Sequence, residues 1–177
     1  MASRIEWTEE TWNPLTGCTK ISSGCKNCYA EVMAKRLQAM GTKGYENGFK
    51  LTIRMDRLNE PLCNKKPTMY FVNSMSDLFH EKVPLEFIDK VFDIIRKASW
   101  HKFQVLTKRA DIMATYFQTR KIPENVWLGV TVENKKEGLP RINYLRSVKD
   151  ATIKFLSVEP LLEDLGDVDF SGLDWII

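Results

Sequence analysis

The stretch Thr68-Met69-Tyr70-Phe71-Val72 is a near-continuous apolar run, which is typical of a β-strand that is covered on both faces. The polar segment Asn73-Ser74-Met75-Ser76-Asp77 follows it, and a helical pattern then begins at Pro84, a residue type favoured in the first turn of a helix. The stretch therefore predicts one unit of strand, loop and helix. One side of that helical pattern is apolar, with Leu85, Ile88, Val91, Phe92 and Ile95 at helical spacing.

The same order of strand and helix recurs through the rest of the chain. Alternating strands and helices with short links are typical of parallel βαβ units. We expect six parallel strands with outer helices, arranged as a partial (β/α)₆ barrel in preference to an open doubly wound sheet. A first short strand is expected within residues 4–17, and an alternating strand pattern at 49–55 is interpreted as an insertion. The other strands are predicted at 68–73, 103–107, 126–132, 153–158 and 174–177, with helical patterns at 84–95, at 112–117 and from Pro140 onward.

The composition is that of an ordinary globular protein of about one domain. The chain has 177 residues, of which 44% are hydrophobic and 28% charged, and its net charge of +3 permits contact with an anionic partner without establishing one. No apolar run reaches the length of a signal peptide or a membrane span, so we expect a cytoplasmic protein with no membrane segment. We expect one domain over residues 1–177. Because the sequence stops at Ile177 inside an apolar strand, we expect that domain to be incomplete at its C-terminal end.

Three of the four cysteines are crowded between Cys18 and Cys28, with the spacing C-x₆-C-x₂-C through Cys25. Thiols this close in sequence usually serve a metal or redox chemistry. Cys28 opens a helical pattern that runs to about Met40, so its sulfur lies where the helix dipole favours the thiolate that binds metal. The spacing predicts a metal or cluster loop that leads into a helix.

Other interpretations of the cysteines stay open at this point. They could be ordinary buried thiols, although three so close together make that improbable, and a disulfide framework fits poorly. A zinc site is the serious rival, because zinc needs a fourth ligand and Cys63, His80 and His101 are available in the sequence. We interpret Cys63 first as a structural thiol and second as that fourth ligand.

Polar residues follow each predicted strand at the point where it ends. In parallel α/β folds, ligands bind at the carboxyl ends of the strands, so these side chains are expected to gather with the cysteines. Amide and carboxylate groups there could hold a ribose or an amino-acid group, and Lys108 or Arg109 could hold a carboxylate or phosphate. The candidate cofactor-binding residues are Asn73, Ser74, Asp77, Lys108, Thr131, Glu133 and Glu159.

Several segments in combination resemble one known family over essentially the whole chain. The chain is similar to the phage-associated three-cysteine-motif family, which itself resembles the radical S-adenosylmethionine enzymes. Those enzymes usually space their cysteines C-x₃-C-x₂-C, whereas the first gap here is six residues. The segments are Trp12-Asn13-Pro14-Leu15-Thr16-Gly17-Cys18, Gly24-Cys25-Lys26-Asn27-Cys28-Tyr29-Ala30-Glu31, Asn73-Ser74-Met75-Ser76-Asp77-Leu78-Phe79, Leu106-Thr107-Lys108-Arg109 and Ser157-Val158-Glu159-Pro160-Leu161.

The resemblance implies a partial barrel with a [4Fe–4S] cluster on the loop after the first strand. It implies that Cys18, Cys25 and Cys28 bind three irons and that the fourth iron chelates S-adenosylmethionine, whose reductive cleavage gives a 5′-deoxyadenosyl radical. It also implies a protein partner encoded nearby and, as a hypothesis, modification of nucleic acid in a phage or mobile-element setting. Two alternatives are a zinc-binding module that contacts nucleic acid through the basic residues at 102–109 and 135–149, and a barrel that only binds another protein.

Overall fold

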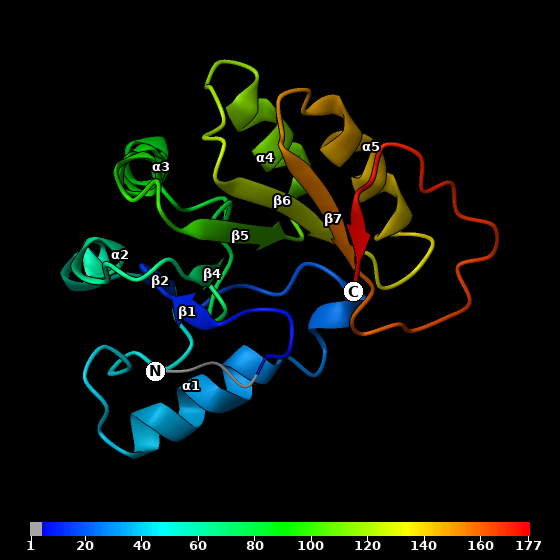
Figure 1. The fold of residues 1–177 in the computed structure, drawn as a ribbon. Coiled ribbons are helices and arrows are strands. Elements are labelled where there is room, and N and C mark those ends of the chain that lie inside the picture. The colour runs from blue at the N-terminus through cyan, green and yellow to red at the C-terminus, as the bar shows by residue number, and fades with distance from the viewer. Residues whose placement is uncertain (1–4) are drawn as a thin grey trace.

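The structure is a computed structural model that describes residues 5–177, so the start of the region in which the first strand is expected lies outside the described residues. Its main sheet has six parallel strands in the order β1-β4-β5-β6-β7-β8 (Figure 1). Because the strands follow one another across the sheet with no reversal, the fold is the barrel-like arrangement and not a doubly wound sheet. The strands are β1 (Glu10–Trp12), β4 (Met69–Val72), β5 (Lys102–Thr107), β6 (Val126–Thr131), β7 (Ile153–Ser157) and β8 (Trp175–Ile176).

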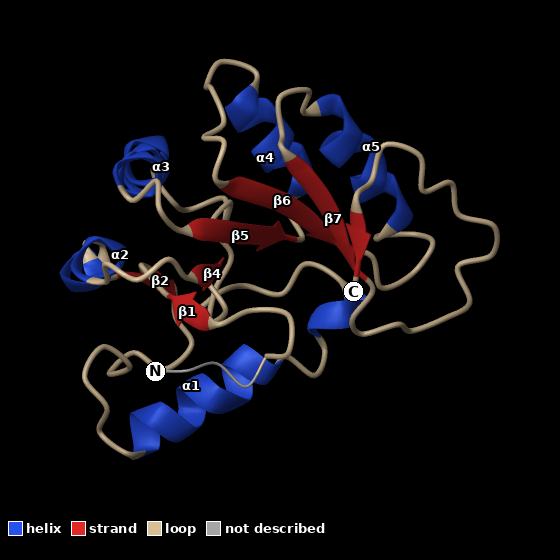
Figure 2. Ribbon diagram, viewed as in Figure 1, coloured by secondary structure: helices blue, strands red, loops and turns tan. Residues whose placement is uncertain are grey.

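Three helices cover the outer face of this sheet: α3 (Leu85–Lys97), α4 (Ala110–Phe117) and α5 (Leu139–Ser147) (Figure 2). They confirm the predicted crossover helices. The link between β7 and β8 is a long loop over residues 158–174, without a helix. Within residues 5–177, no helix is long and apolar enough to span a membrane.

The extra strand predicted at 49–55 is wrong in extent. Only β3 (Thr52–Ile53) forms there, and it pairs antiparallel with β2 (Leu15–Thr16) in a separate small sheet. A turn occupies the start of the predicted range, where Lys50 N–H donates to the carbonyl of Asn47 at 3.2 Å. Two 3₁₀ turns, η1 (Ser23–Cys25) and η2 (Met55–Arg57), and the short helix α2 (Glu60–Cys63) complete the elements.

The helix after the cysteines, α1 (Tyr29–Ala39), forms where it is predicted, but its apolar pattern is only partly buried. Met33 and Leu37 of that pattern pack with the buried Ala30 and Ala34, whereas Tyr29, Val32 and Met40 are exposed. The reason is that α1 lies apart from α3, α4 and α5, below β1 in Figure 1, and packs with a small cluster of its own that includes Tyr45 and Met75.

Two layers of side chains hold the sheet. On the helix side, Phe103, Val105, Leu128 and Val130 belong to one large buried cluster with residues of α3, α4 and α5. Each buried aliphatic or aromatic side chain there contributes about 1.5–3 kcal/mol to stability.

On the inner side of the sheet, Phe155 of β7 lies against Gly129 of β6. A Cβ atom at position 129 would lie 2.4 Å from Cζ of Phe155, so only glycine fits. Trp7 closes this interior near the strand starts, with its ring centroid 4.7 Å from that of Phe71 and 6.4 Å from that of Phe155.

Candidate functional site

A cavity of about 880 Å³ lies at the carboxyl ends of the strands, where the sequence places the candidate residues. Cys18, Cys25 and Cys28 all line it, although they come from a loop outside the sheet. Apolar Phe71 and Leu106 also line it. Six of the seven candidate cofactor residues line the same cavity: Asn73, Ser74, Asp77, Lys108, Thr131 and Glu159.

Gly17 brings the cysteine loop to this edge of the sheet. Its φ of +78° is in the left-handed region, and a Cβ atom there would lie 2.2 Å from the carbonyl oxygen of Lys50. Gly17 N–H donates to the carbonyl of Met75 at 2.9 Å, and Cys18 N–H donates to the carbonyl of Phe49 at 3.2 Å. The first cysteine is thereby fixed beside the segment that follows β4.

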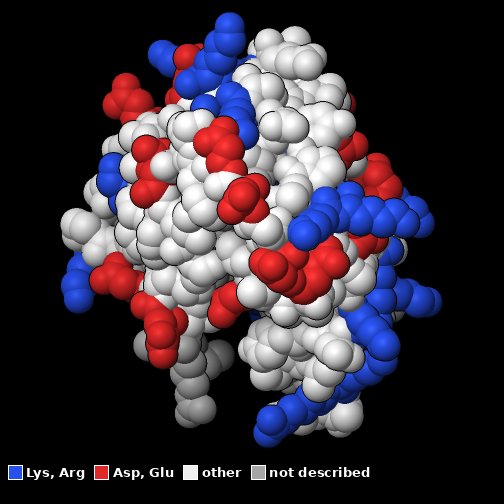
Figure 3. All heavy atoms as spheres, turned by 90° about the vertical axis from the view of Figure 1, so that its right-hand side faces the viewer, with Lys and Arg blue, Asp and Glu red and all other residues white. Residues whose placement is uncertain are grey.

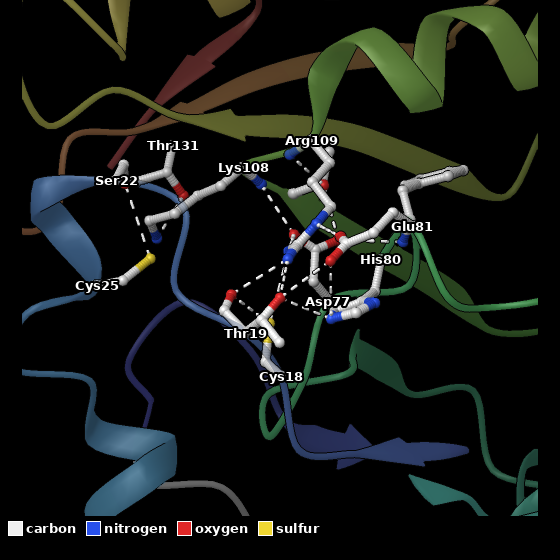
Figure 4. Close-up of polar contacts among 12 residues, drawn as sticks. Cys18, Thr19, Ser22, Cys25, Asp77, His80, Glu81, Lys108, Arg109 and Thr131 are labelled. Carbon is white, nitrogen blue, oxygen red and sulfur yellow. Dashed lines mark hydrogen bonds and ion pairs between the residues drawn. The ribbon is translucent and has the colours of Figure 1, made fainter. Parts of the chain in front are cut away.

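Arg109 ties Cys18 to the end of β5 (Figure 4). The guanidinium is 4% exposed, and its Nη1 lies 3.5 Å from the sulfur of Cys18. The same group donates to Asp77 Oδ2 at 3.2 Å, to Glu81 Oε2 at 2.7 Å and to the carbonyl of Thr19 at 3.1 Å. Sequence reasoning names Arg109 only as an anion-binding alternative to Lys108, whereas its five donors here hold the loop.

His80 completes this network and is not free to bind a metal. Lys82 N–H donates to its Nδ1, which leaves the proton on Nε2 to donate to Thr19 Oγ1 at 2.9 Å. Burial lowers the pKa of His80, and the neighbouring Arg109 lowers it further, so the ring is neutral at pH 7. The hydroxyl of Thr19 in turn donates to Glu81 Oε1 at 3.1 Å.

Two carboxylates anchor the middle of the cysteine loop. Glu133 accepts a short hydrogen bond from Ser22 Oγ and is paired with Arg141 of α5. Glu137 accepts from the backbone N–H and hydroxyl of Ser23 at 2.9 and 2.7 Å. The sequence carries no signal for the contacts with Ser22 and Ser23, because these residues lie more than a hundred positions away from Glu133 and Glu137.

Glu133 therefore differs from the other candidate residues. It is fully buried and does not line the cavity. Gly24 of the cysteine loop packs directly on it, since a Cβ atom at position 24 would lie 3.0 Å from Cγ of Glu133. The structure places Glu133 behind the cysteine loop.

Asn73 presents a buried donor to the cavity. Its φ of +63° is unusual for a residue with a side chain, and its Oδ1 accepts from Leu15 N–H at 3.3 Å. Its Nδ2 is buried and has no hydrogen-bond partner among the described residues, which is costly unless a ligand accepts from it. Asn13 donates to neighbouring Ser74 Oγ at 3.1 Å and holds that hydroxyl in place.

The side chain of Asp77 at the cavity wall is held by hydrogen bonds, whereas that of Lys108 keeps donors available for a ligand. Both oxygens of Asp77 accept hydrogen bonds, from Thr107 Oγ1 at 2.7 Å and from Lys108 N–H at 3.2 Å, so this carboxylate supports the wall. The ammonium of Lys108 donates to Thr131 Oγ1 at 3.3 Å and keeps two donors for a ligand. Glu159, which follows β7, is exposed and lines the same cavity.

The chemistry of the thiols suits metal binding, although they do not converge. All are free, and within residues 5–177 no three His, Cys, Asp or Glu side chains lie close enough to hold a metal ion as they stand. Burial raises the pKa of Cys18, with Asp77 adding to that effect and Arg109 opposing it. At Cys25 burial also favours the thiol, but hydrogen bonds from the backbone of Ile21 and Ser22 outweigh it and lower the pKa. The donor set fits an iron–sulfur cluster, and the sulfurs have to turn inward to hold one.

The fourth ligand that a closed zinc site needs is not beside these cysteines. Cys63 is exposed on α2 and lines a separate cavity with Glu60 and Tyr70. His101 is buried, accepts from Thr68 N–H at 3.1 Å and contacts the carbonyl of Pro61 at 3.0 Å. Cys63 and His101 are thus separated from the cysteines, and both ring nitrogens of His80, the third candidate, already make hydrogen bonds.

Acidic and basic side chains both occur on the face seen in Figure 3. Acidic side chains lie over much of that face, whereas a run of Lys and Arg side chains gathers along its lower right edge. Glu163 and Asp169 of the 158–174 loop carry negative charge, accepting from Lys135 N–H at 2.6 Å and pairing with Arg146 at 3.1 Å. The charge of this face is therefore mixed, with positive charge gathered at one edge.

Comparison with solved structures identifies the same fold in spore photoproduct lyase. Its complex with dinucleoside spore photoproduct has a TM-score of 0.57 and 14% sequence identity, over 90% of this chain and 48% of that one. A double mutant with bound AdoMet and dinucleoside spore photoproduct has a TM-score of 0.54 and 14% identity, over 88% and 47%. This chain thus spans about half the length of these relatives, and at such identity the likeness establishes the fold.

Sequence comparisons give a family and no curated relative. The search of curated proteins found no match. The match to a family covers residues 2–177, which is nearly the whole chain. The chain therefore belongs to the family described as "Protein of unknown function (DUF5131)".

Proposed function

We propose that this protein is an iron–sulfur enzyme that uses S-adenosylmethionine, with Cys18, Cys25 and Cys28 as ligands of a [4Fe–4S] cluster. The observation that carries the proposal is the meeting of three free thiols and the unpaired amide of Asn73 at one cavity, at the carboxyl ends of a partial barrel. The AdoMet bound in a double mutant of spore photoproduct lyase, which shares the fold, supports it.

Each cavity residue has a role that follows from its chemistry. A bound cluster would supply an electron to S-adenosylmethionine, whose cleavage would give a radical able to abstract hydrogen. Asn73 Nδ2 would donate to an oxygen of the cofactor, and the ammonium of Lys108 would pair with the cofactor carboxylate. Ser74 Oγ donates to Asn13 Oδ1 at 3.2 Å, so towards the cofactor it would accept from an N–H or O–H group. Thr131 orients Lys108, and Glu159 accepts from an amine or a ribose hydroxyl at the open side. Asp77 supports the wall of the cavity, and Glu133 contributes indirectly by holding the cysteine loop in place.

The substrate in this proposal is a nucleic acid, in a phage or mobile-element setting and in the cytoplasm. Support comes from the dinucleoside photoproduct bound to spore photoproduct lyase and from the lysines at the cysteine loop, of which Lys26 lines the cavity. The mixed charge of the surrounding face favours a short contact at the cavity over a long backbone footprint. A protein partner encoded nearby would add the surface that this chain lacks.

The zinc module has less support than the iron–sulfur enzyme. A structural zinc site needs four ligands, and Cys63 and His101 lie elsewhere in the fold.

The test of the proposal is reductive cleavage of the cofactor. Protein purified and reconstituted without oxygen is reduced with dithionite and supplied with S-adenosylmethionine, and 5′-deoxyadenosine is measured by chromatography. The proposal predicts 5′-deoxyadenosine from wild type and Cys63→Ala, and none from Cys28→Ala. A loaded cluster that neither binds nor cleaves S-adenosylmethionine would reject the enzymatic role.

A further inference from the structure

A second cavity, of about 700 Å³, opens at the end of the sheet where the strands begin, away from the cysteines. Met69, Ile153 and Trp175, the first residues of β4, β7 and β8, lie on its wall. None of its residues lines the cysteine cavity, so whatever it binds is separate from the proposed cluster.

Three of the five tryptophans of the chain line this cavity: Trp7, Trp127 and Trp175. The ring centroid of Trp175 lies 6.4 Å from that of Trp7, at an interplanar angle of 80°, and 5.8 Å from that of Trp127, at 84°. Two indoles thus stand nearly perpendicular to the third. Since an indole face carries negative potential, such walls attract a cation placed between them.

Among residues 5–177, the charged side chains that line the cavity have one sign. They are Glu6, Glu9 and Asp174, and no Lys, Arg or His of this described part of the chain lines it. Glu9 accepts from Met69 N–H at 2.6 Å and Asp174 accepts from Lys154 N–H at 2.7 Å, which fixes both carboxylates at the rim. A positive ligand would meet aromatic faces and carboxylates together.

Closing the barrel does not by itself explain this arrangement. Trp7 packs on Phe71 and Phe155, and Trp175 also packs on Phe155, with ring centroids 5.8 Å apart. Closure of the barrel does not require Trp127, which contacts Trp175 and stays half-buried beside an open cavity with an acidic rim.

We propose that this cavity binds an organic cation, whose alkylated ammonium or guanidinium head lies between the indoles and faces the carboxylates. Cation–π attraction and the negative rim select the charge of the ligand, and the indole walls select its apolar substituents. The head could belong to a free small molecule or to a side chain of a protein.

The experiment is a titration followed by intrinsic tryptophan fluorescence. The probes are choline and its uncharged isostere 3,3-dimethyl-1-butanol, which have the same shape and differ in charge. We expect a saturable change with choline and none with the neutral alcohol. An N-acetylated, amidated Gly-Arg-Gly peptide tests the other source: tighter binding than choline assigns the site to a protein side chain, and weaker binding assigns it to a free cation.

Two variants, each with a matched control, test whether the cation binds in this cavity. Trp127→Leu is expected to weaken choline binding about 2- to 30-fold, the range of one cation–π contact, whereas Trp100→Leu, outside the cavity, leaves it unchanged. Should Trp127→Leu fail to fold, exposed Glu6 provides a second test: Glu6→Gln weakens binding and Glu86→Gln on α3 does not. The proposal is overturned by equal responses to choline and the alcohol, by no saturable response to choline or the peptide, or by equal effects of a variant and its control.

Discussion

Arg109 and Cys18 lie 91 residues apart in the chain, yet Nη1 of one is 3.5 Å from the sulfur of the other. The guanidinium also holds Thr19, the next residue of the loop, and is itself fixed by Asp77 and Glu81. The first cysteine of the motif is thus bound to the end of β5 through one buried side chain. A hydrogen bond to a ligating sulfur both positions it and stabilises added negative charge.

Arg109→Lys tests this tie while keeping the positive charge beside Asp77. A lysine has no planar fork, so it cannot reach Cys18, Thr19 and Glu81 together. We expect the affinity for the cluster to fall about 10- to 100-fold, as for other residues that orient metal ligands. Iron per chain after anaerobic reconstitution measures the loss, and a redox titration followed by electron paramagnetic resonance should show a lower potential.

The matched control for Arg109 is Arg120→Lys. Arg120 pairs with Asp89 at 2.6 Å on the outer side of the fold and does not line the cysteine cavity. The Arg120→Lys variant should keep both the iron content and the reduction potential of wild type. Wild-type values in Arg109→Lys as well would show that the contact with Cys18 has no role in holding the cluster.

Glu133 and Glu159 follow two different strands, and the structure predicts opposite effects for their amide variants. Glu133→Gln removes the charge that pairs with buried Arg141, which costs about 3–5 kcal/mol because a buried ion is left without its partner. Glu159→Gln changes an exposed side chain, so stability stays within about 0.5 kcal/mol of wild type while affinity for S-adenosylmethionine falls. Urea unfolding and calorimetric titration of the reconstituted protein separate the two. A Glu133→Gln variant as stable as wild type would show that Glu133 does not anchor the cysteine loop.

Asn73→Gly tests the unpaired amide. Glycine adopts the φ of +63° without strain, so the variant keeps the backbone while it removes Nδ2 together with Oδ1, the acceptor for Leu15 N–H. Loss of one hydrogen bond predicts about 2- to 13-fold weaker binding of S-adenosylmethionine. Calorimetry measures it, and Ser76→Ala, which removes another hydroxyl from the cavity lining, should bind within twofold of wild type. Unchanged binding by Asn73→Gly would mean that the cofactor does not accept from this amide.

The hydrogen bonds between Glu137 and Ser23 make the stability of the folded protein depend on pH. Hydrogen bonds from the backbone and hydroxyl of Ser23 lower the pKa of Glu137 from 4.5 to about 2. A carboxyl whose pKa is depressed in the folded state stabilises that state above its unfolded pKa, and the stabilisation disappears as the pH falls towards 2. Wild type should therefore melt at a higher temperature than Glu137→Gln at pH 6, and the difference should close between pH 4.5 and 2. A difference that stays constant through that range would contradict the assignment.

Much of this arrangement follows from sequence, because parallel strands bring their carboxyl ends to one edge. Asn73, Lys108 and Thr131 reach the cavity since each follows or ends a predicted strand. The spacing of the cysteines places all three on one loop, and Gly17 and Gly24 mark its close contacts with Lys50 and Glu133.

The rest could not be predicted, because it depends on which way side chains turn after a strand ends. Glu133 turns away from the cavity towards Arg141, and Arg109 turns across the sheet edge to a cysteine from another part of the chain. The apolar pattern of α1 is buried only in part for a related reason. The helix packs in a cluster of its own through the side that carries Ala34, Met33 and Leu37, so Val32 of the pattern faces solvent. Only the folded contacts distinguish these cases.

Metal analysis of protein prepared without oxygen tests the central claim most directly. The account predicts about four iron atoms per chain in wild type and in Cys63→Ala, with broad absorption near ~400 nm, and loss of iron in Cys18→Ala, Cys25→Ala and Cys28→Ala. One zinc per chain without iron, lost on Cys63→Ala, would contradict it.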